Sequence, residues 1–181
     1  MKLTRKLAIM GMFSAIAFVL SCLGNLLPIR FAGFLNYDPK DVMIVIAGFA
    51  LGPLATIAIS LVVSLVEMLF ISSTGIIGFL MNVISSVCFA LIPALLYKKN
   101  RCFKSAIIGL IIGCAVTTLM MLLWNYFVTP FYMEIPREAI AQMLLPVFLP
   151  FNLLKTGANA IIVVLIYKPI SRALKHLSIL E

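Results

Sequence analysis

Three polar side chains interrupt an apolar stretch near the C-terminal end, in the sequence PFNLLKTGANA of residues 150–160. Asn152 and Lys155 are three residues apart, and Lys155 and Asn159 are four apart, so a helix would place all three on one face. A lysine at the centre of a bilayer costs roughly 2.5 to 3.5 kcal/mol on insertion scales. Because amides both donate and accept hydrogen bonds and lysine carries three donors, this face has the chemistry to bind carbonyl and N–H groups.

Other apolar stretches also contain single polar residues, namely Glu67 in SLVEMLF, Asn82 in FLMNVI and Asn125 in LLWNYF. A carboxylate and two amides add hydrogen-bond acceptors and donors to the group on residues 152–159. Whether these side chains meet depends on the elements that carry them.

The composition predicts an all-α integral membrane protein. Hydrophobic residues make up 64% of the chain and charged residues 11%, and the mean hydropathy is +1.19. The apolar runs are continuous rather than alternating, which favours spanning helices over a barrel. We expect one transmembrane substrate-binding domain over residues 1–181, and we expect the N-terminal run MKLTRKLAIMGMFSAIAFVL to be retained as its first helix.

The net charge of +8 does not indicate a nucleic-acid partner. The fourteen lysines and arginines lie at the edges of apolar runs, and no basic stripe with interleaved aromatics occurs. They fit the role of topology determinants on the cytoplasmic side of a membrane.

Five apolar blocks are visible, at residues 7–27, 42–71, 75–96, 105–128 and 143–167. As one helix the second block would be about 45 Å long, which exceeds the roughly 30 Å of bilayer hydrocarbon. It contains Gly52 and Pro53, which suit the end of one helix and the first turn of the next. We therefore predict a short helix at 42–51 and a longer one at 54–71.

The charges favour six helices with both termini in the cytoplasm. In this arrangement the N-terminus, the loop YKKNRCFK and the C-terminal tail all lie inside, with ten of the fourteen basic residues. The connections 28–41 and 129–142 then lie outside and carry four of the six acidic residues. With five helices the N-terminus, the loop and the tail could not all lie inside.

This topology brings the polar residues of four helices to one depth near the outer surface. One interpretation is a Glu67–Lys155 salt bridge that joins helices, with asparagines as interhelical hydrogen bonds. The other is a cavity open to the outside, lined by Glu67, Asn82, Asn125, Asn152 and Lys155, which suits a flat heteroaromatic ligand. The clustering beside several aromatic residues favours the cavity, and we expect Glu67, Asn125 or water to bind Asn152 and Lys155 when it is empty.

Three stretches carry a resemblance to a known family: PFNLLK, WNYFVTPFY and FLNYDPKDVMIVIAGFALGP. Through them, and over nearly its whole length, the chain is similar to the riboflavin-binding S components of energy-coupling factor (ECF) vitamin transporters. The resemblance implies a substrate-capture subunit in a bacterial cell membrane, which works with a transmembrane coupling subunit and two cytoplasmic ATPases. Riboflavin would be a transported ligand, and no cofactor is expected.

The resemblance also implies roles for particular residues. Asn125, Asn152 and Lys155 match the positions that hold the flavin ring. The segment 28–41 corresponds to a lid over the pocket, and its residues here include Asn36, Tyr37, Asp38 and Pro39, with Tyr37 also a candidate ligand contact. Small residues on the first helix contact the coupling subunit in the family, and the nearest match is Gly11 with Ala15.

Other functions are compatible with parts of the sequence. Lys155 could bind a phosphate, so an S component for flavin mononucleotide or another vitamin stays open. A self-contained secondary transporter would normally contain paired half-repeats, which are not apparent. An enzyme is not expected, because the membrane runs contain one carboxylate and no histidine, and no metal-ligand spacing occurs. The sequence contains no GxxxxGK[ST] motif, so energy must come from a partner or an ion gradient.

Overall fold

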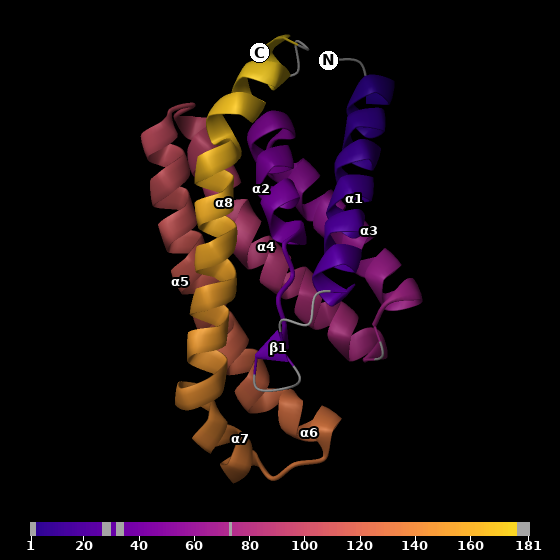
Figure 1. The fold of residues 1–181 in the computed structure, drawn as a ribbon, viewed down its shortest axis with the longest axis vertical. Helices are drawn as coiled ribbons and strands as arrows, with labels where there is room; N and C mark the ends of the chain where they lie inside the picture. Colours follow the sequence, from indigo (N-terminus) through magenta and orange to yellow (C-terminus); the bar gives the residue numbers. More distant parts are fainter. Residues whose placement is uncertain (1–2, 27–29, 32–34, 73, 177–181) are drawn as a thin grey trace.

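The computed structural model describes residues 3–26, 30–31, 35–72 and 74–176. Long helices run side by side through most of the molecule (Figure 1): α1 Leu3–Leu26, α3 Pro53–Phe70, α4 Gly75–Lys99, α5 Phe103–Phe127 and α8 Leu149–His176. Among the described residues, five helices are long and apolar enough to cross a membrane. The prediction of an all-α, membrane-type fold is confirmed.

The break inside the long second block lies where the sequence predicts it. The short helix α2 spans Lys40–Leu51, and α3 begins at Pro53 in its first turn. Gly52 has φ 90°, a backbone conformation that favours glycine, and its N–H donates to the carbonyl of Gly48 at 2.9 Å. Proline suits the first turn of α3 because that position needs no N–H donor.

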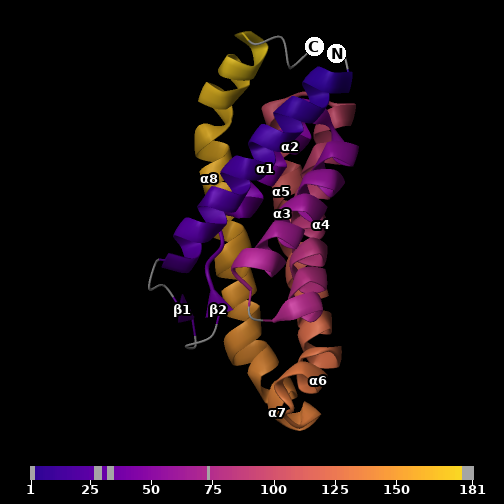
Figure 2. The ribbon, with the colours of Figure 1, turned by 90° about the vertical axis from the view of Figure 1, so that its right-hand side faces the viewer.

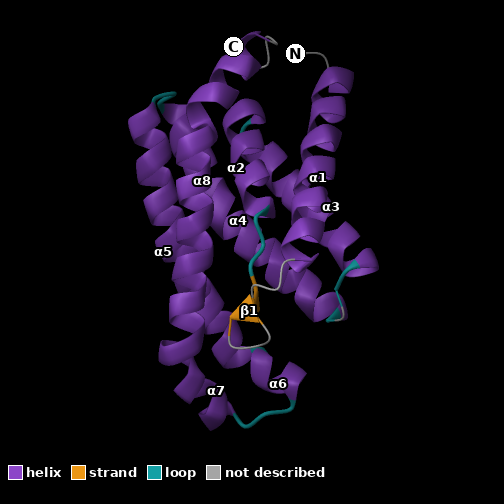
Figure 3. Ribbon diagram, in the orientation of Figure 1, coloured by secondary structure: helices purple, strands orange, loops and turns teal. Residues whose placement is uncertain are grey.

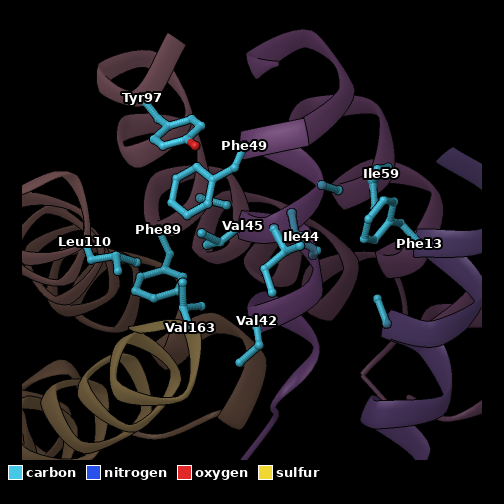
Figure 4. Close-up of a cluster of buried hydrophobic side chains, with 14 of the residues drawn as sticks. Phe13, Val42, Ile44, Val45, Phe49, Ile59, Phe89, Tyr97, Leu110 and Val163 are labelled. Atoms are coloured by element: carbon cyan, nitrogen blue, oxygen red, sulfur yellow. The ribbon is translucent and has the colours of Figure 1, made fainter. Parts of the chain in front are cut away.

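Helix α2 forms the centre of the bundle. Its twelve residues correspond to about 18 Å of helix, which is shorter than the bilayer hydrocarbon. Figure 4 shows Val42, Ile44, Val45 and Phe49 of this helix within a cluster of buried apolar side chains from its neighbours. A Cβ on Gly48 would lie 2.5 Å from Thr56 Oγ1. Glycine here therefore lets α2 and α3 approach closely.

The connection predicted over residues 28–41 is shorter in the structure, because Lys40 and Asp41 belong to the first turn of α2. It contains two strands, β1 Arg30–Phe31 and β2 Leu35–Asn36, which pair antiparallel with Arg30 opposite Asn36. Figure 3 shows this small hairpin beside the helical bundle.

The connection predicted over 129–142 is not a loop. It contains α6 Thr129–Met133 and α7 Arg137–Met143, and a π-helical turn at Leu144–Phe148 joins α7 to α8. The turn includes Pro146, which has no N–H for a helical hydrogen bond, and π-turns accommodate such interruptions within a continuing helix. The continuous helical segment that ends in α8 therefore begins at Arg137, before the predicted residue 143.

The two ends of the bundle differ. The described ends of α1 and α8 nearest the termini lie at one end, and α6, α7 and the hairpin lie toward the other (Figure 2). The described acidic residues lie away from the terminal end, within or next to the half that contains the hairpin. The site described next lies in this acidic half of the bundle.

Candidate functional site

A cavity of about 270 Å³ opens between the hairpin and the helices α1, α3, α4 and α8. Its volume is close to the lower end of the roughly 300 to 1,000 Å³ typical of small-molecule sites. Six of the nine predicted ligand and lid residues line it: Asn36, Tyr37, Asp38, Glu67, Asn82 and Lys155. Side chains from four separate parts of the chain therefore meet here, as the predicted helix directions require.

A buried lysine contacts two of the residues that line the cavity. Lys40, at the start of α2, has no exposed surface, and its Nζ lies 2.9 Å from Asp38 Oδ2. The same ammonium donates a hydrogen bond to Glu67 Oε2 of α3. A buried ammonium is tolerated where carboxylates surround it. Lys40 therefore joins residues 37–39, the linker before α2, to α3. The sequence prediction missed Lys40 because it placed this residue in a loop.

The alternative interpretation, an ion pair between Glu67 and Lys155, is not what the structure contains. Glu67 pairs with Lys40, and Lys155 Nζ lies 3.9 Å from Asp41 Oδ2 on α2. The other oxygen of Asp41 accepts a hydrogen bond from Ser86 Oγ of α4 at 2.5 Å. The physical reason is that α2 packs between α3 and α8 and presents its own charged residues to both.

The charges of this cluster leave an excess of one negative charge when all are ionised, from Asp38, Asp41 and Glu67 against Lys40 and Lys155. Among the described residues, Glu67 Oε1 is buried without a hydrogen-bond partner. An unpaired buried acceptor costs about 1 to 3 kcal/mol, so a donor from a bound ligand would be favourable here. Lys155 remains one-tenth exposed and can also reach the cavity.

Asn159 holds one wall of the cavity in place. It is fully buried on α8, and its Oδ1 accepts a hydrogen bond from Tyr37 Oη at 2.7 Å. Its Nδ2 donates to the carbonyl of Asp38 at 3.1 Å. Two consecutive residues of the linker are thus bound by one amide, which uses both its donor and its acceptor.

The ionisable groups of this wall keep the forms that these bonds require. Burial raises the pKa of Tyr37 above its usual value, and the charges of Asp38 and Asp41 add to the effect. The phenol therefore stays protonated and donates to Asn159. Burial also raises the pKa of Asp38, but the charges of Lys40 and Lys155 outweigh it, so this pKa lies below its usual range.

Asn125 and Asn152 do not line the cavity in this structure. Asn125 Nδ2 donates to the carbonyl of Met121 at 2.7 Å, and its Oδ1 accepts from Thr129 Oγ1 at 2.9 Å. Asn152 Nδ2 donates to the carbonyl of Phe148 at 2.8 Å. In the described part of the chain, no hydrogen bond joins Asn152 to Glu67 or Asn125, and its amide nitrogen donates instead to the carbonyl one turn back.

The remaining predicted positions, Pro39, Gly11 and Ala15, lie against α1 or on it. Pro39 packs against α1, where a Cβ on Gly24 would lie 2.9 Å from Pro39 Cδ and 2.7 Å from the carbonyl of Tyr37. Gly11 and Ala15 are exposed on α1, and a Cβ added to Gly11 would meet no atom within 4 Å. Gly24 therefore lets the linker approach the helix, whereas Gly11 leaves an open place on its outer face.

This geometry defines a class of protein: a helical membrane bundle with a polar cavity toward one end, built to bind a small molecule. The model of the family described as ECF transporter, substrate-specific component, matches residues 5–167. The chain belongs to this family.

Named relatives agree with the family. The chain is 33% identical to the riboflavin transporter RibU of Staphylococcus aureus (strain TCH60), over 98% of this chain and 96% of the relative. It is 30% identical to the riboflavin transporter FmnP of Bacillus subtilis (strain 168), over 90% of each. A solved S component of a bacterial ECF transporter superposes with a TM-score of 0.80 at 32% identity, covering 96% of this chain and 99% of that one.

Proposed function

We propose that this chain captures riboflavin from the outer side of a bacterial cell membrane, as the substrate-binding subunit of an ECF importer. The observation that carries the proposal is the cavity itself, in which a lysine, two carboxylates, amides and a tyrosine face one space. The relatives that share its sequence over most of their length are named riboflavin transporters. The transported vitamin is the ligand, and no cofactor is proposed.

Riboflavin has groups that match these side chains. Its flavin ring has carbonyl oxygens, ring nitrogens and one N–H at an edge, and its sugar-derived chain carries hydroxyls. Lys155 and Asn82 can donate to the carbonyls, and the unpartnered Glu67 Oε1 can accept from a hydroxyl or from the N–H. Each such bond would replace water and satisfy a group that is otherwise poorly paired.

Asn125 and Asn152 remain proposed ring contacts. Asn152 belongs to α8, where its neighbours Phe151 and Lys155 line the cavity, and Asn125 belongs to α5, which packs against α4 and α8. Each amide nitrogen can donate its second N–H to a ligand edge, or it can exchange the carbonyl of its own helix for that edge. The exchange is nearly neutral in hydrogen bonds, because one acceptor replaces another.

The neutral vitamin fits this cavity better than its phosphate ester does. Asp38 and Glu67 line the cavity with negative charge, and Lys155 is already close to Asp41. A phosphate would add up to two negative charges beside these carboxylates. We therefore propose riboflavin rather than flavin mononucleotide as the preferred ligand.

The proposed topology has six membrane helices, with α2 as the short second one and both termini in the cytoplasm. The described ends of α1 and α8 nearest the termini lie at the same end of the bundle, as an even number of spans requires (Figure 1). The basic residues Lys98, Lys99, Arg101 and Lys104 lie between α4 and α5 or at their ends, at that end of the bundle. Positive residues favour the cytoplasmic side.

The proposed partners are a transmembrane coupling subunit and two cytoplasmic ATPases. The chain has no P-loop motif of its own, and it is proposed to act in binding and delivery rather than in catalysis. The exposed face of α1 at Gly11 and Ala15 offers a place where a partner helix can approach closely.

Quenching of riboflavin fluorescence by the purified protein tests the proposal. Lys155→Met should weaken binding at least tenfold, because it removes the charged donor in the cavity. Lys168→Met is the matched control, since Lys168 is exposed near the other end of α8. Equal affinity in the two variants, or no quenching by the unmodified protein, would refute the assignment.

A further inference from the structure

A second cavity, of about 180 Å³, lies at the end of the bundle where the described part of α1 begins and that of α8 ends. Lys6 of α1, Lys98 near the end of α4 and Arg101 after it line this cavity, together with the α2–α3 junction around Gly52. Its volume is about ten times the ~15 Å³ that a single water needs. It is separate from the polar cavity described above, and no residue lines both.

The three cations have no acidic partner among the described residues. In the part of the chain that the structure describes, none of them forms an ion pair with a carboxylate. Lys98 and Arg101 are exposed and Lys6 is half-buried. Three like charges around one cavity repel each other, so an anion in the cavity would lower the electrostatic free energy.

Part of the wall between these cations is apolar. Phe49 and Tyr97 are buried and form part of the lining, and their rings lie 4.6 Å apart between centroids. Leu54, in the first turn of α3, also lines the cavity and is 77% exposed at the surface of the bundle. The cavity thus places three cations beside an apolar outer surface.

We propose that this cavity binds the phosphate headgroup of an anionic phospholipid, with the acyl chains lying outside against Leu54 and α3. The cations match the phosphate, and the apolar surface matches the chains, which a free phosphate ion does not have. Basic pockets between helices on the cytoplasmic side are suited to anionic headgroups, which the inner leaflet supplies. The leaflet rests on the proposed topology, but the site does not depend on which vitamin is transported.

Native mass spectrometry of the detergent-purified chain, with added dioleoylphosphatidylglycerol or dioleoylphosphatidylcholine, tests this site. The triple variant K6Q/K98Q/R101Q should bind phosphatidylglycerol at least tenfold more weakly than the unmodified chain. The matched control K99Q/K104Q/K168Q removes three exposed cations that do not line the cavity, and it should keep normal binding. Riboflavin quenching should be the same in both triple variants, which separates this site from the vitamin cavity.

Several results would overturn the proposal. Equal loss in both triple variants would indicate a diffuse attraction of the basic end for anionic lipid. Equal binding of phosphatidylcholine would mean that the headgroup charge is not recognised. Displacement of phosphatidylglycerol by millimolar inorganic phosphate would identify a free-phosphate site instead. The last outcome concerns the thermal unfolding midpoint. If K6Q/K98Q/R101Q lowered this midpoint by the same amount with phosphatidylglycerol as with phosphatidylcholine, the cations would serve only to neutralise the carbonyl end of α2.

Discussion

Asn159 of α8 accepts a hydrogen bond from Tyr37 Oη at 2.7 Å, across 122 positions of sequence. The same amide donates to the carbonyl of Asp38. Because Tyr37 and Asp38 line the polar cavity, this contact fixes one wall of the proposed vitamin site to the helix that carries Lys155.

Asn159→Leu should therefore speed the release of riboflavin. The substitution removes both hydrogen bonds, each worth about 0.5 to 1.5 kcal/mol, so the dissociation rate constant should rise about tenfold. Stopped-flow fluorescence measures it. Tyr37→Phe removes one of the two bonds and should have a smaller effect. An unchanged rate in Asn159→Leu would mean that the wall does not control release.

Lys40→Met should destabilise the folded protein strongly. It leaves the buried carboxylates of Asp38 and Glu67 without their cation, and breaking one partner of a buried pair costs about 3 to 5 kcal/mol. The thermal unfolding midpoint in detergent should fall. Lys40→Met combined with Glu67→Leu should recover part of the loss, because it removes one stranded charge. A double variant no more stable than Lys40→Met would argue against the pair.

Riboflavin binding should persist as the pH falls from 7 to 5. The pKa of Asp38 is lowered, so its pairing with Lys40 is fully present above the ordinary aspartate value of about 3.9 and is lost only as the pH falls through the lowered folded value. Quenching titrations across this range provide the test. A loss centred near pH 6 that disappears in Asp38→Asn would show that burial dominates over Lys40.

Gly11→Leu should leave riboflavin binding unchanged and lower uptake in cells that contain the complete importer. The added side chain points into open space, where a partner helix is proposed to lie. Gly157→Leu is the control, since a Cβ at Gly157 also meets no atom within 4 Å and lies on α8 instead. Normal uptake and normal assembly with the coupling subunit in Gly11→Leu would exclude this face of α1 from docking.

Much of the architecture follows from local sequence signals. Gly52 followed by Pro53 predicts the α2–α3 break because each residue has a distinct backbone preference. Alternating helix directions also place Glu67, Asn82 and Lys155 at one depth, and all three line the cavity. Depth along a spanning helix is a one-dimensional property that the sequence can supply.

The pairing of buried charges could not be predicted in the same way. Lys40 follows Pro39 at the edge of an apolar run, where a loop and a first helical turn have similar composition. Its contact with Glu67 depends on how α2 packs against α3, which spacing along the chain does not contain. Asn152 differs again: the carbonyl of Phe148, one turn away on its own helix, outcompetes the long-range partners that depth alone suggests.

The most direct measurement is an absorption spectrum of the protein purified in detergent from cells grown with riboflavin. A yellow flavin chromophore should co-purify with the unmodified chain, and it should be lost in Asn152→Leu and Lys155→Ala while both variants remain folded. A colourless protein that also fails to quench added riboflavin would contradict riboflavin capture.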